Sequence, residues 1–386
     1  MKTISKILDK IHNISRNRHR YNPIILLAVG LLPCLAGSGL KADARPLVGA
    51  YYYPWYGPGA HTIADSARMQ LKPAQKPLLG DYDSRGQNVI LQHINQSVRG
   101  NIAFWACSWW GPGSYEDVTI KNHLRKYLSG GRLKYAILYE STGRLRAASN
   151  PSYNTFLTDV DYLARTFFPD DSYLRIDGRP VLFIYLTRVY FRDKGDEVLA
   201  RLRAAHPDLY IVADDVFGPD YRAAWAARWD AVTAYDAYGQ SLGIHGSTAK
   251  AIATLAANYA EAKAAADVAG TAFVPAVTPG FNDKAVRGGH RVAPRYLEDE
   301  QAVSYGAVFT RMLKEAALPF LDVRAERMLM VTSFNEWHED TQIEPTAGRK
   351  SEATGLPAGI TENKLHEDYG FGYLDILREV TCEEVD

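Results

Sequence analysis

Eight short apolar runs, rich in β-branched and aromatic residues, constrain the fold of this chain more than any other feature. They cover residues 48–56, 101–110, 133–140, 180–186, 209–216, 229–237, 273–281 and 329–337. Most are continuously apolar instead of alternating, which is typical of strands buried on both faces. Amphipathic segments lie between them, such as 247–270. Eight strands with interposed helices in about 340 residues predict an α/β fold, a single (β/α)8 TIM-type barrel.

The alternative for this pattern is an open, doubly wound sheet. Such sheets commonly carry a G-x-G-x-x-G motif after the first strand, and none follows the run 48–56. The stretch 57–88 has little helical pattern, so we expect an elaborated loop after the first strand. No internal repeat, low-complexity tract or linker divides the rest of the chain, and we expect one catalytic domain over residues 45–386.

The first 44 residues are expected to lie outside this domain. Lysines and arginines up to Arg20 precede the apolar run 24–40, and an A-x-A pattern follows at 42–44. This order is typical of a secretory signal peptide, so we expect cleavage after Ala44 and an exported protein, either periplasmic or secreted. An uncleaved membrane anchor is the alternative, although the apolar run is short and contains Gly and Pro.

Charge and cysteine content bear on the classes of partner and cofactor. The 44 basic and 44 acidic residues give a formal net charge of zero, which does not indicate nucleic acid as a partner. Only Cys107 and Cys382 remain after residue 44, and no Cys/His spacing resembles a zinc site, so we predict no metal and no other cofactor. The 24 tyrosines and 7 tryptophans have flat rings that suit sugar faces as well as protein cores.

Six of the predicted strands end in distinctive polar or aromatic residues. In a (β/α)8 barrel the carboxyl ends of the strands meet on one face, where active sites lie. Such ends predict a polar cleft with aromatic walls, which indicates carbohydrate as the ligand. The candidates for contact with substrate are Tyr53, Trp55, Tyr56, Trp109, Trp110, Glu140, Tyr235, Tyr238, Asn335, Trp337 and His338. Asp214 and Asp215 stand near the end of the run 209–216, but they are also suited to capping the next helix.

The segment VTSFNEWHEDTQIEP, residues 331–345, brings Glu336 and Glu339 beside a tryptophan and a histidine. Glycoside hydrolysis commonly uses two carboxyl groups that flank the scissile bond. Residues three apart point to opposite faces of a continuing strand, so we expect the strand to end and the chain to turn near Trp337. Simpler interpretations stay open: Glu339 as a solvated loop carboxylate, Glu336 as the partner of an arginine, and His338 as an ordinary loop histidine. The tryptophans are equally suited to core packing.

Five segments, in chain order, carry a resemblance to a known family. They are YYYPWYG (51–57), LGDYDS (79–84), IDGRPVLFIY (176–185), FVPAVTPGFND (273–283) and TSFNEWHEDTQIEP (332–345). With these motifs the chain resembles glycoside hydrolase family 99, the retaining endo-acting α-mannosidases and α-mannanases, and the related glycan-processing proteins. The last segment is the most specific, and the resemblance covers nearly all of residues 45–386.

The resemblance implies a retaining, endo-acting hydrolase that cleaves internal α-linked bonds of an oligo- or polysaccharide, with α-mannosides as its substrates. It implies that Glu336 acts on the substrate 2-hydroxyl, which attacks the anomeric carbon and forms an anhydro-sugar intermediate. Glu339 would be the general acid and then the general base, and Glu140 would contact the sugar at the point of cleavage. Tyr53 and Trp55 would help to form the wall of that subsite.

The implied roles require different protonation states. Glu339 must hold a proton near neutral pH, so burial or a nearby negative charge must raise its pKa, whereas Glu336 must stay ionised. The sequence also departs from the family pattern. The family's usual Gly after the second acid is Asp340 here, which we expect to add charge beside the general acid, and Phe281 lacks the hydroxyl of the usual Tyr.

Two further functions stay open. A polysaccharide-modifying glycosyl transferase or transglycosylase would use the same two acids to pass the sugar to a hydroxyl acceptor instead of water. A non-catalytic carbohydrate-binding barrel would be favoured if either Glu336 or Glu339 were absent, and both are present.

Overall fold

The computed structural model describes residues 45–382, apart from 193, 238–247, 289, 291, 298–301, 304, 349–350 and 352–363. The predicted signal segment 1–44 and the candidate Tyr238 therefore lie outside the described residues. In the part of the chain that is described, no helix is both long enough and apolar enough to cross a membrane.

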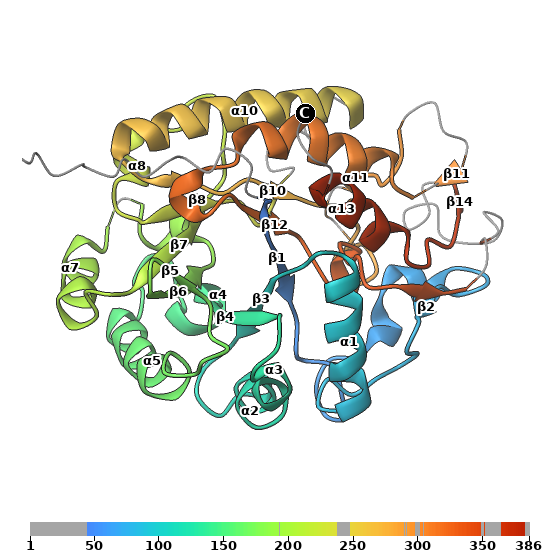
Figure 1. Ribbon diagram of the computed structural model, residues 1–386, viewed down its shortest axis with the longest axis horizontal. Helices are drawn as coiled ribbons and strands as arrows, with labels where there is room; N and C mark the ends of the chain where they lie inside the picture. Colours follow the sequence, from blue (N-terminus) through green and yellow to red (C-terminus); the bar gives the residue numbers. More distant parts are fainter. Residues whose placement is uncertain are drawn as a thin grey trace, which may run out of the picture. The chain divides into compact units, whose positions relative to one another are not determined.

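The centre of the fold is a closed parallel sheet, which Figure 1 shows encircled by helices. Its strands are β1 (Leu47–Tyr52), β3 (Phe104–Trp109), β4 (Lys134–Tyr139), β6 (Arg179–Ile184), β7 (Tyr210–Asp214), β8 (Ala231–Thr233), β9 (Ala272–Phe273), β10 (Ala276–Val277) and β12 (Met328–Val331). Neighbouring strands pair in parallel from β12 through β1 to β9, and β10 pairs back onto β12. The predicted (β/α)8 barrel is confirmed, and every predicted run overlaps a barrel strand.

The seventh barrel strand is split into β9 and β10, which the continuous apolar run did not indicate. Val274 and Pro275 separate the two pieces, and a proline has no N–H to donate to a neighbouring strand. The Pro275 carbonyl still accepts a hydrogen bond from Met330 at 3.0 Å, and Val274 N–H donates to the Val232 carbonyl at 2.9 Å. The strand therefore keeps its place in the barrel across the break.

Aromatic rings fill the interior of the barrel. The Tyr51 ring on β1 lies 6.2 Å from the Phe183 ring on β6, and these strands are not neighbours in the sheet, so the contact crosses the interior. The Phe104 ring lies 6.0 Å from the same phenylalanine. A Cβ at Gly49 would lie 2.1 Å from the Phe104 ring, so the glycine leaves the space that this ring occupies.

Helices and single turns connect the strands. The helices are α1 (Gln87–Arg99), α2 (Tyr115–Thr119), α3 (Arg125–Leu128), α4 (Ser141–Leu145), α5 (Tyr153–Thr166), α6 (Thr187–Tyr190), α7 (Asp196–Ala205), α8 (Ala223–Ala226), α10 (Thr248–Ala269), α11 (Ala307–Arg311) and α13 (Gly372–Cys382). The π and 3-10 turns η4 (Ile120–Leu124), η5 (Met312–Ala317), η6 (Leu318–Phe320) and η7 (Val323–Ala325) add to them. The long helix predicted over 247–270 is α10, and Gly270 follows it with a φ of 71°.

The elaborated loop after the first strand packs against the segment that follows the last one. It contains the 3-10 turns η2 (Ile63–Asp65) and η3 (Ala67–Gln70) and the short strand β2 (Lys76–Pro77), and α1 begins after it. Strand β2 pairs antiparallel with β13 (Thr346–Ala347), which lies beyond β12 (Figure 1). Two other short pairings are β5 (Arg175–Ile176) with β6, and β11 (Ala302–Val303) with β14 (Leu365–His366). The loop after β1 and the chain after β12 thus meet beside the carboxyl ends of the strands.

Candidate active site

The chain turns sharply after β12, as the spacing of its two acids predicts. The 3-10 turn η8 (Trp337–Glu339) begins after Glu336, whose Oε1 accepts a hydrogen bond from the His338 N–H at 2.9 Å. It ends at Asp340, which has a φ of 50°. Glu336 and Glu339 thus stand at the start and the end of one turn, and we call these two residues the acid pair.

The carboxyl group of Glu339 is held by groups from two other loops. Its Oε2 accepts a hydrogen bond from the Tyr235 hydroxyl at 2.8 Å, and the Tyr53 hydroxyl donates to Tyr235 at 2.8 Å. Its Oε1 accepts from Arg287 Nη1 at 3.1 Å. The Glu339 carbonyl accepts from the Asn282 N–H at 2.7 Å. A chain of two tyrosines and one arginine therefore fixes the orientation of this carboxyl group.

A third acid, Glu140, lies beside the acid pair at the end of β4. Its Oε1 accepts a hydrogen bond from the Ser108 hydroxyl at 2.7 Å, and the Trp110 indole N–H donates to the same hydroxyl at 3.0 Å. Burial raises the pKa of Glu140 to about 8, against the Ser108 hydrogen bond, and the charge of Glu339 adds to the rise. This electrostatic coupling places Glu140 in the same cluster as the acid pair.

The protonation of the acid pair only partly follows the expectation from sequence. Burial raises the pKa of both groups, and the charge of Glu339 raises the pKa of Glu336 further. The hydrogen bond from Tyr235 and the charge of Arg287 oppose the rise at Glu339. The pKa of Glu339 is therefore raised as expected, but Glu336, expected to stay ionised, also has a pKa well above its ordinary value. The two groups titrate as a pair.

Aromatic rings stand next to these acids. The Trp55 ring lies 4.2 Å from His61, 4.7 Å from Tyr53 and 6.5 Å from Trp110. His338 lies 6.1 Å from Trp55, and its Nε2 bonds the Thr62 carbonyl. Three candidate residues, Tyr53, Trp55 and Trp110, are thus brought together with His338 as the sequence predicts.

Three other candidates support the turn from behind. Asn335 is fully buried, accepts from the Tyr53 N–H at 2.7 Å and donates to the Tyr53 carbonyl at 3.0 Å. The Tyr56 hydroxyl donates to the Asn335 carbonyl at 3.0 Å and accepts from the Trp337 N–H at 3.1 Å. The Trp337 indole N–H donates to Glu344 at 2.7 Å. Asn335, Tyr56 and Trp337 thus fix the chain that carries the acids, and their contact with sugar stays a prediction.

Glu344 itself joins the turn to the elaborated loop and α1. Besides Trp337, it accepts a hydrogen bond from the Tyr82 hydroxyl at 2.9 Å and lies 3.1 Å from His93 Nε2. The Tyr52 hydroxyl lies 3.0 Å from the other ring nitrogen of His93. All these side chains are buried, so the network forms a rigid support beneath the site.

Trp109 does not lie at the site. It is fully buried, its indole N–H donates to Asp117 at 2.9 Å, and its ring stacks on Tyr162 at 6.1 Å. It therefore packs between β3 and the helices α2 and α5. We correct its predicted contact with substrate, because side chains alternate along a strand and Trp109 points away from the face that Ser108 and Trp110 share.

Asp214 ties together the ends of three barrel strands. Its carboxylate accepts hydrogen bonds from the Leu186 N–H at 2.9 Å and from the Tyr235 N–H at 2.6 Å. Burial raises its pKa to about 7, against the charge of Arg188 and these two hydrogen bonds. Asp215 pairs with Arg192 instead. The alternative that these aspartates cap the next helix is wrong, since α8 begins only at Ala223.

Three residues of the cluster were missed as site residues. Arg287 contacts Glu339 directly, His61 lies against Trp55, and the Tyr185 ring lies 5.4 Å from Tyr235. Tyr185 follows directly after β6, so the rule that polar groups at strand ends line the site would have found it. Arg287 and His61 lie in loops without periodicity, and only the fold brings them here. Among the described residues, no cluster of His, Cys, Asp and Glu is arranged to hold a metal ion.

Comparisons with known proteins agree with this architecture. The family model for Glycosyl hydrolase family 99 matches residues 56–369. The chain is 22% identical over 381 residues to the glycoprotein endo-alpha-1,2-mannosidase of Mus musculus, covering 88% of this chain and 75% of the relative. It is 23% identical over 360 residues to a glycoprotein endo-alpha-1,2-mannosidase-like protein of Homo sapiens, covering 83% and 71%. The solved GH99 endo-alpha-mannosidase of Bacteroides thetaiotaomicron shares the fold, with a TM-score of 0.62 at 21% identity over 87% of this chain and 97% of that one.

Proposed function

Because the chain belongs to glycosyl hydrolase family 99 and is therefore a glycoside hydrolase, we propose that it cleaves internal α-mannosidic bonds of an oligo- or polysaccharide with retention of configuration. The observation that carries the proposal is the acid pair, placed at the two ends of one buried turn, with Glu339 held by Tyr235. Glycoside hydrolysis commonly needs two such carboxyl groups. The names of the relatives supply the substrate class, since they are endo-α-mannosidases.

In the first step the substrate provides its own nucleophile. The Glu336 carboxylate takes the proton of the 2-hydroxyl, and the freed oxygen attacks the anomeric carbon. The bond from the anomeric carbon to the leaving oxygen breaks, and that oxygen takes the proton held by Glu339. A 1,2-anhydro sugar and a shortened chain result, and the acid pair has moved one proton from Glu339 to Glu336.

The second step returns both acids to their starting state. The Glu339 carboxylate takes a proton from water, whose oxygen attacks the anomeric carbon. The anhydro C1–O2 bond breaks, and O2 takes the proton back from Glu336. Two displacements at one carbon retain its configuration. The net reaction is hydrolysis of one α-linked bond.

Both steps need one proton on the acid pair near neutral pH. Burial and the mutual charge of the two groups, which raise both pKa values, favour a singly protonated pair. Tyr235 and Arg287 favour the ionised form of Glu339. A substrate 2-hydroxyl that donates to Glu336 would stabilise its ionised form and shift the shared proton to Glu339. We therefore propose that substrate binding completes the protonation that the roles require.

The test compares the full-length chain with Glu336→Gln, Glu339→Gln and a matched control, Asp375→Asn, whose carboxylate forms an exposed ion pair with Arg99. Each protein is incubated with α-mannans and bacterial exopolysaccharides, and new reducing ends are measured over time. We expect cleavage by the parent and the control and its loss in both glutamine variants, with NMR showing the α-anomer as the first product. Unchanged cleavage by Glu339→Gln would refute the assignment.

The same reactions distinguish the two other functions. A transferase or transglycosylase would give longer products with a hydroxyl acceptor and few new reducing ends. A carbohydrate-binding barrel would bind a polysaccharide equally well with or without Glu339 and release nothing.

We also propose that the protein is exported and that residues 1–44 are removed, on the basis of the basic region, the apolar run and the A-x-A pattern. N-terminal sequencing of protein recovered from the producing cells tests this. A new N-terminus at Arg45 is expected, whereas an intact N-terminus in the membrane fraction would favour the anchor.

A further inference from the structure

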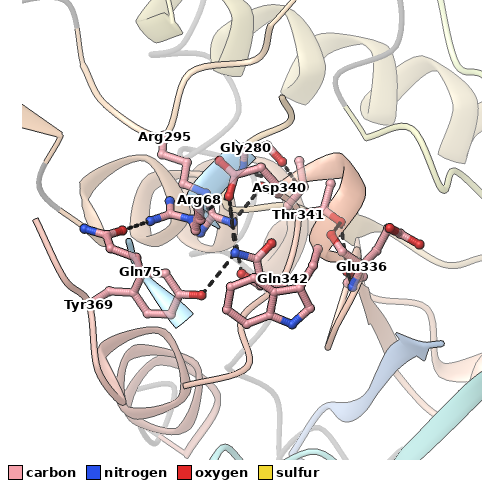
Figure 2. Close-up of polar contacts among 12 residues, drawn as sticks. Arg68, Gln75, Gly280, Arg295, Glu336, Asp340, Thr341, Gln342 and Tyr369 are labelled. Atoms are coloured by element: carbon pink, nitrogen blue, oxygen red, sulfur yellow. Dashed lines mark hydrogen bonds and ion pairs between the residues drawn. The ribbon is translucent and has the colours of Figure 1, made fainter. Parts of the chain in front are cut away.

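A buried ionic cluster lies directly behind the turn that carries the acid pair. The Asp340 carboxylate accepts a hydrogen bond from Arg68 Nε at 2.5 Å and one from Gln342 Nε2 at 3.2 Å, and Arg295 Nη2 lies 3.3 Å from it. In Figure 2 these side chains gather around Asp340, while Glu336 lies on the other side of the same turn. We call Asp340, Arg68, Arg295 and Gln342 the brace.

The brace draws together segments that are distant in the sequence. Arg68 belongs to η3 of the elaborated loop and also bonds Gln75, whose amide donates to the His366 carbonyl at 2.8 Å. Gln342 donates to the Tyr369 hydroxyl at 3.2 Å. All the brace side chains are buried, so these bonds are shielded from water. The loop after the first strand and the C-terminal segment are thereby tied to the turn.

The brace fixes the backbone directly after Glu339. The Asp340 carbonyl accepts a second bond from Arg295 Nη2 at 2.6 Å, and the Glu339 carbonyl accepts from the Asn282 N–H at 2.7 Å. Asp340 has a φ of 50°, a left-handed conformation that costs a residue with a Cβ about 1 kcal/mol and persists only where its surroundings hold it. Asp340 thus carries the charge that the sequence indicated next to Glu339, and Arg68 and Arg295 surround that charge.

A glycine makes room for the second arginine. A Cβ at Gly280 would lie 2.5 Å from Cγ of Arg295 and 2.9 Å from the Ala293 carbonyl oxygen, so no larger residue fits there without displacing Arg295. Gly280 follows the seventh barrel strand, close to Asn282, which holds the Glu339 carbonyl. The loop after this strand thus accommodates the brace and also contacts the general acid.

We propose that Asp340, Arg68 and Arg295 are positioning residues that hold the Glu339 carboxyl group where it meets the departing oxygen. Through Arg68, the elaborated first loop becomes part of the catalytic apparatus. This inference rests on the proposed role of Glu339 as general acid. It predicts a defect that depends on the leaving group, because a fluoride departs without a proton whereas a sugar oxygen needs one.

The test measures the rate of the first step for full-length Asp340→Asn, in single turnovers with the enzyme in excess. The substrates are the α-linked oligosaccharide that the parent cleaves and the same donor sugar carrying a fluoride leaving group. We expect this rate to fall about 10- to 100-fold on the oligosaccharide, the cost of misplacing a catalytic group by about 1 Å. We expect a fall of less than about 3-fold in fluoride release, because fluoride departs without a proton from Glu339, and the water step that uses Glu339 as base comes after this release.

The matched control is Asp322→Asn. Asp322 is also buried and bonded to an arginine, with Arg324 Nε at 3.0 Å, but it supports the Phe273 N–H at the start of β9, the opposite end of the barrel. Its loss should leave both first-step rates unchanged in the folded protein. Arg68→Met keeps Arg295 on Asp340, so it is expected to fold even if Asp340→Asn does not, and to show the same selective fall to a smaller extent.

The outcomes separate the two proposals. If Glu339→Gln lowers the first-step rate equally on both substrates, Glu339 is not the general acid and the inference fails with the proposed function. If Glu339→Gln is selective while Asp340→Asn and Arg68→Met lower the first-step rate equally on both substrates, or on neither, only the positioning role is overturned. Selective losses in all three establish it.

Discussion

Glu339 and Asp340 are neighbours in the chain, Asp340 buried and Glu339 with 14% of its side chain exposed, yet their surroundings give them opposite properties. Burial raises the pKa of Glu339, and the single exposed Arg287 does not reverse the rise. Burial also acts to raise the pKa of Asp340, but the charges of Arg295 and Arg68 outweigh it and hold that pKa below its usual range. The counter-ions, more than the burial, therefore distinguish a carboxyl group that can move a proton from one that holds structure.

The largest effect expected from this comparison is on activity at the acid pair. Glu336→Gln should lower kcat/KM by about 10³-fold or more, the upper range for one general acid–base group. Its free energy of unfolding at pH 7 should not fall, because the change removes a buried carboxyl group that lies near the charge of Glu339. Steady-state kinetics measures kcat/KM, and urea unfolding measures the free energy of unfolding. A large loss of stability would mean that the Glu336 carboxyl group stabilises the fold, as the Asp340 carboxylate of the brace does.

The brace should show the opposite pattern in stability. Asp340→Asn leaves two buried guanidinium groups without their carboxylate, which should cost about 3–5 kcal/mol at pH 7. The pKa of Asp340 is lower in the folded protein than its unfolded value of about 3.8, so the ionised carboxylate stabilises the fold above that pH. This stabilisation is lost as the pH falls through the folded pKa. The difference between parent and variant should therefore shrink in acid. A loss below about 1 kcal/mol at pH 7 would contradict the ionic brace.

Glu140 gives the converse dependence of stability on pH. Its pKa is raised from 4.5 to about 8, so the folded state retains a proton that the unfolded chain has released, and stability falls as pH rises through this window. Glu140→Gln should match the parent near pH 4 and exceed its free energy of unfolding by up to roughly 4 kcal/mol above pH 8. Urea unfolding at a series of pH values measures this, with Asp375→Asn as an exposed control. If the difference in free energy of unfolding between Glu140→Gln and the parent did not change with pH, burial would not raise the pKa of Glu140.

The barrel and the acid pair could be predicted from the sequence because their signals are local. Most barrel strands lie in nearly continuous apolar runs, and Asn335 to Glu339 stand where the last apolar run stops. The period-two rule would also have placed Trp109 on the outer face, opposite Ser108. These signals depend only on residues close together in the chain.

The brace could not be predicted because its charges meet across large sequence separations. Arg68 is 272 residues from Asp340, and Arg295 is 45 residues from it. Neither arginine lies in a periodic segment, so nothing local distinguishes it from a solvated surface arginine. The sequence therefore indicated an extra charge at Asp340 but not the charges that neutralise it.

The smallest expected effect concerns Arg287, whose charge reduces the difference in pKa between Glu339 and Asp340. Its side chain is half exposed and bonds both Glu339 and Asp283. Its charge lowers the pKa of Glu339, so Arg287→Met should raise that pKa, keep the general acid protonated to higher pH and move the basic limb of the kcat/KM profile upward. Stability should change by less than about 1 kcal/mol, since the pair is solvent-screened. Arg99→Met, which breaks an exposed pair with Asp375, is the control and should leave the limb in place. A downward shift of the basic limb in Arg287→Met would show that Arg287 does not favour the ionised form of Glu339. Counter-ions would then not explain why the pKa values of Glu339 and Asp340 differ.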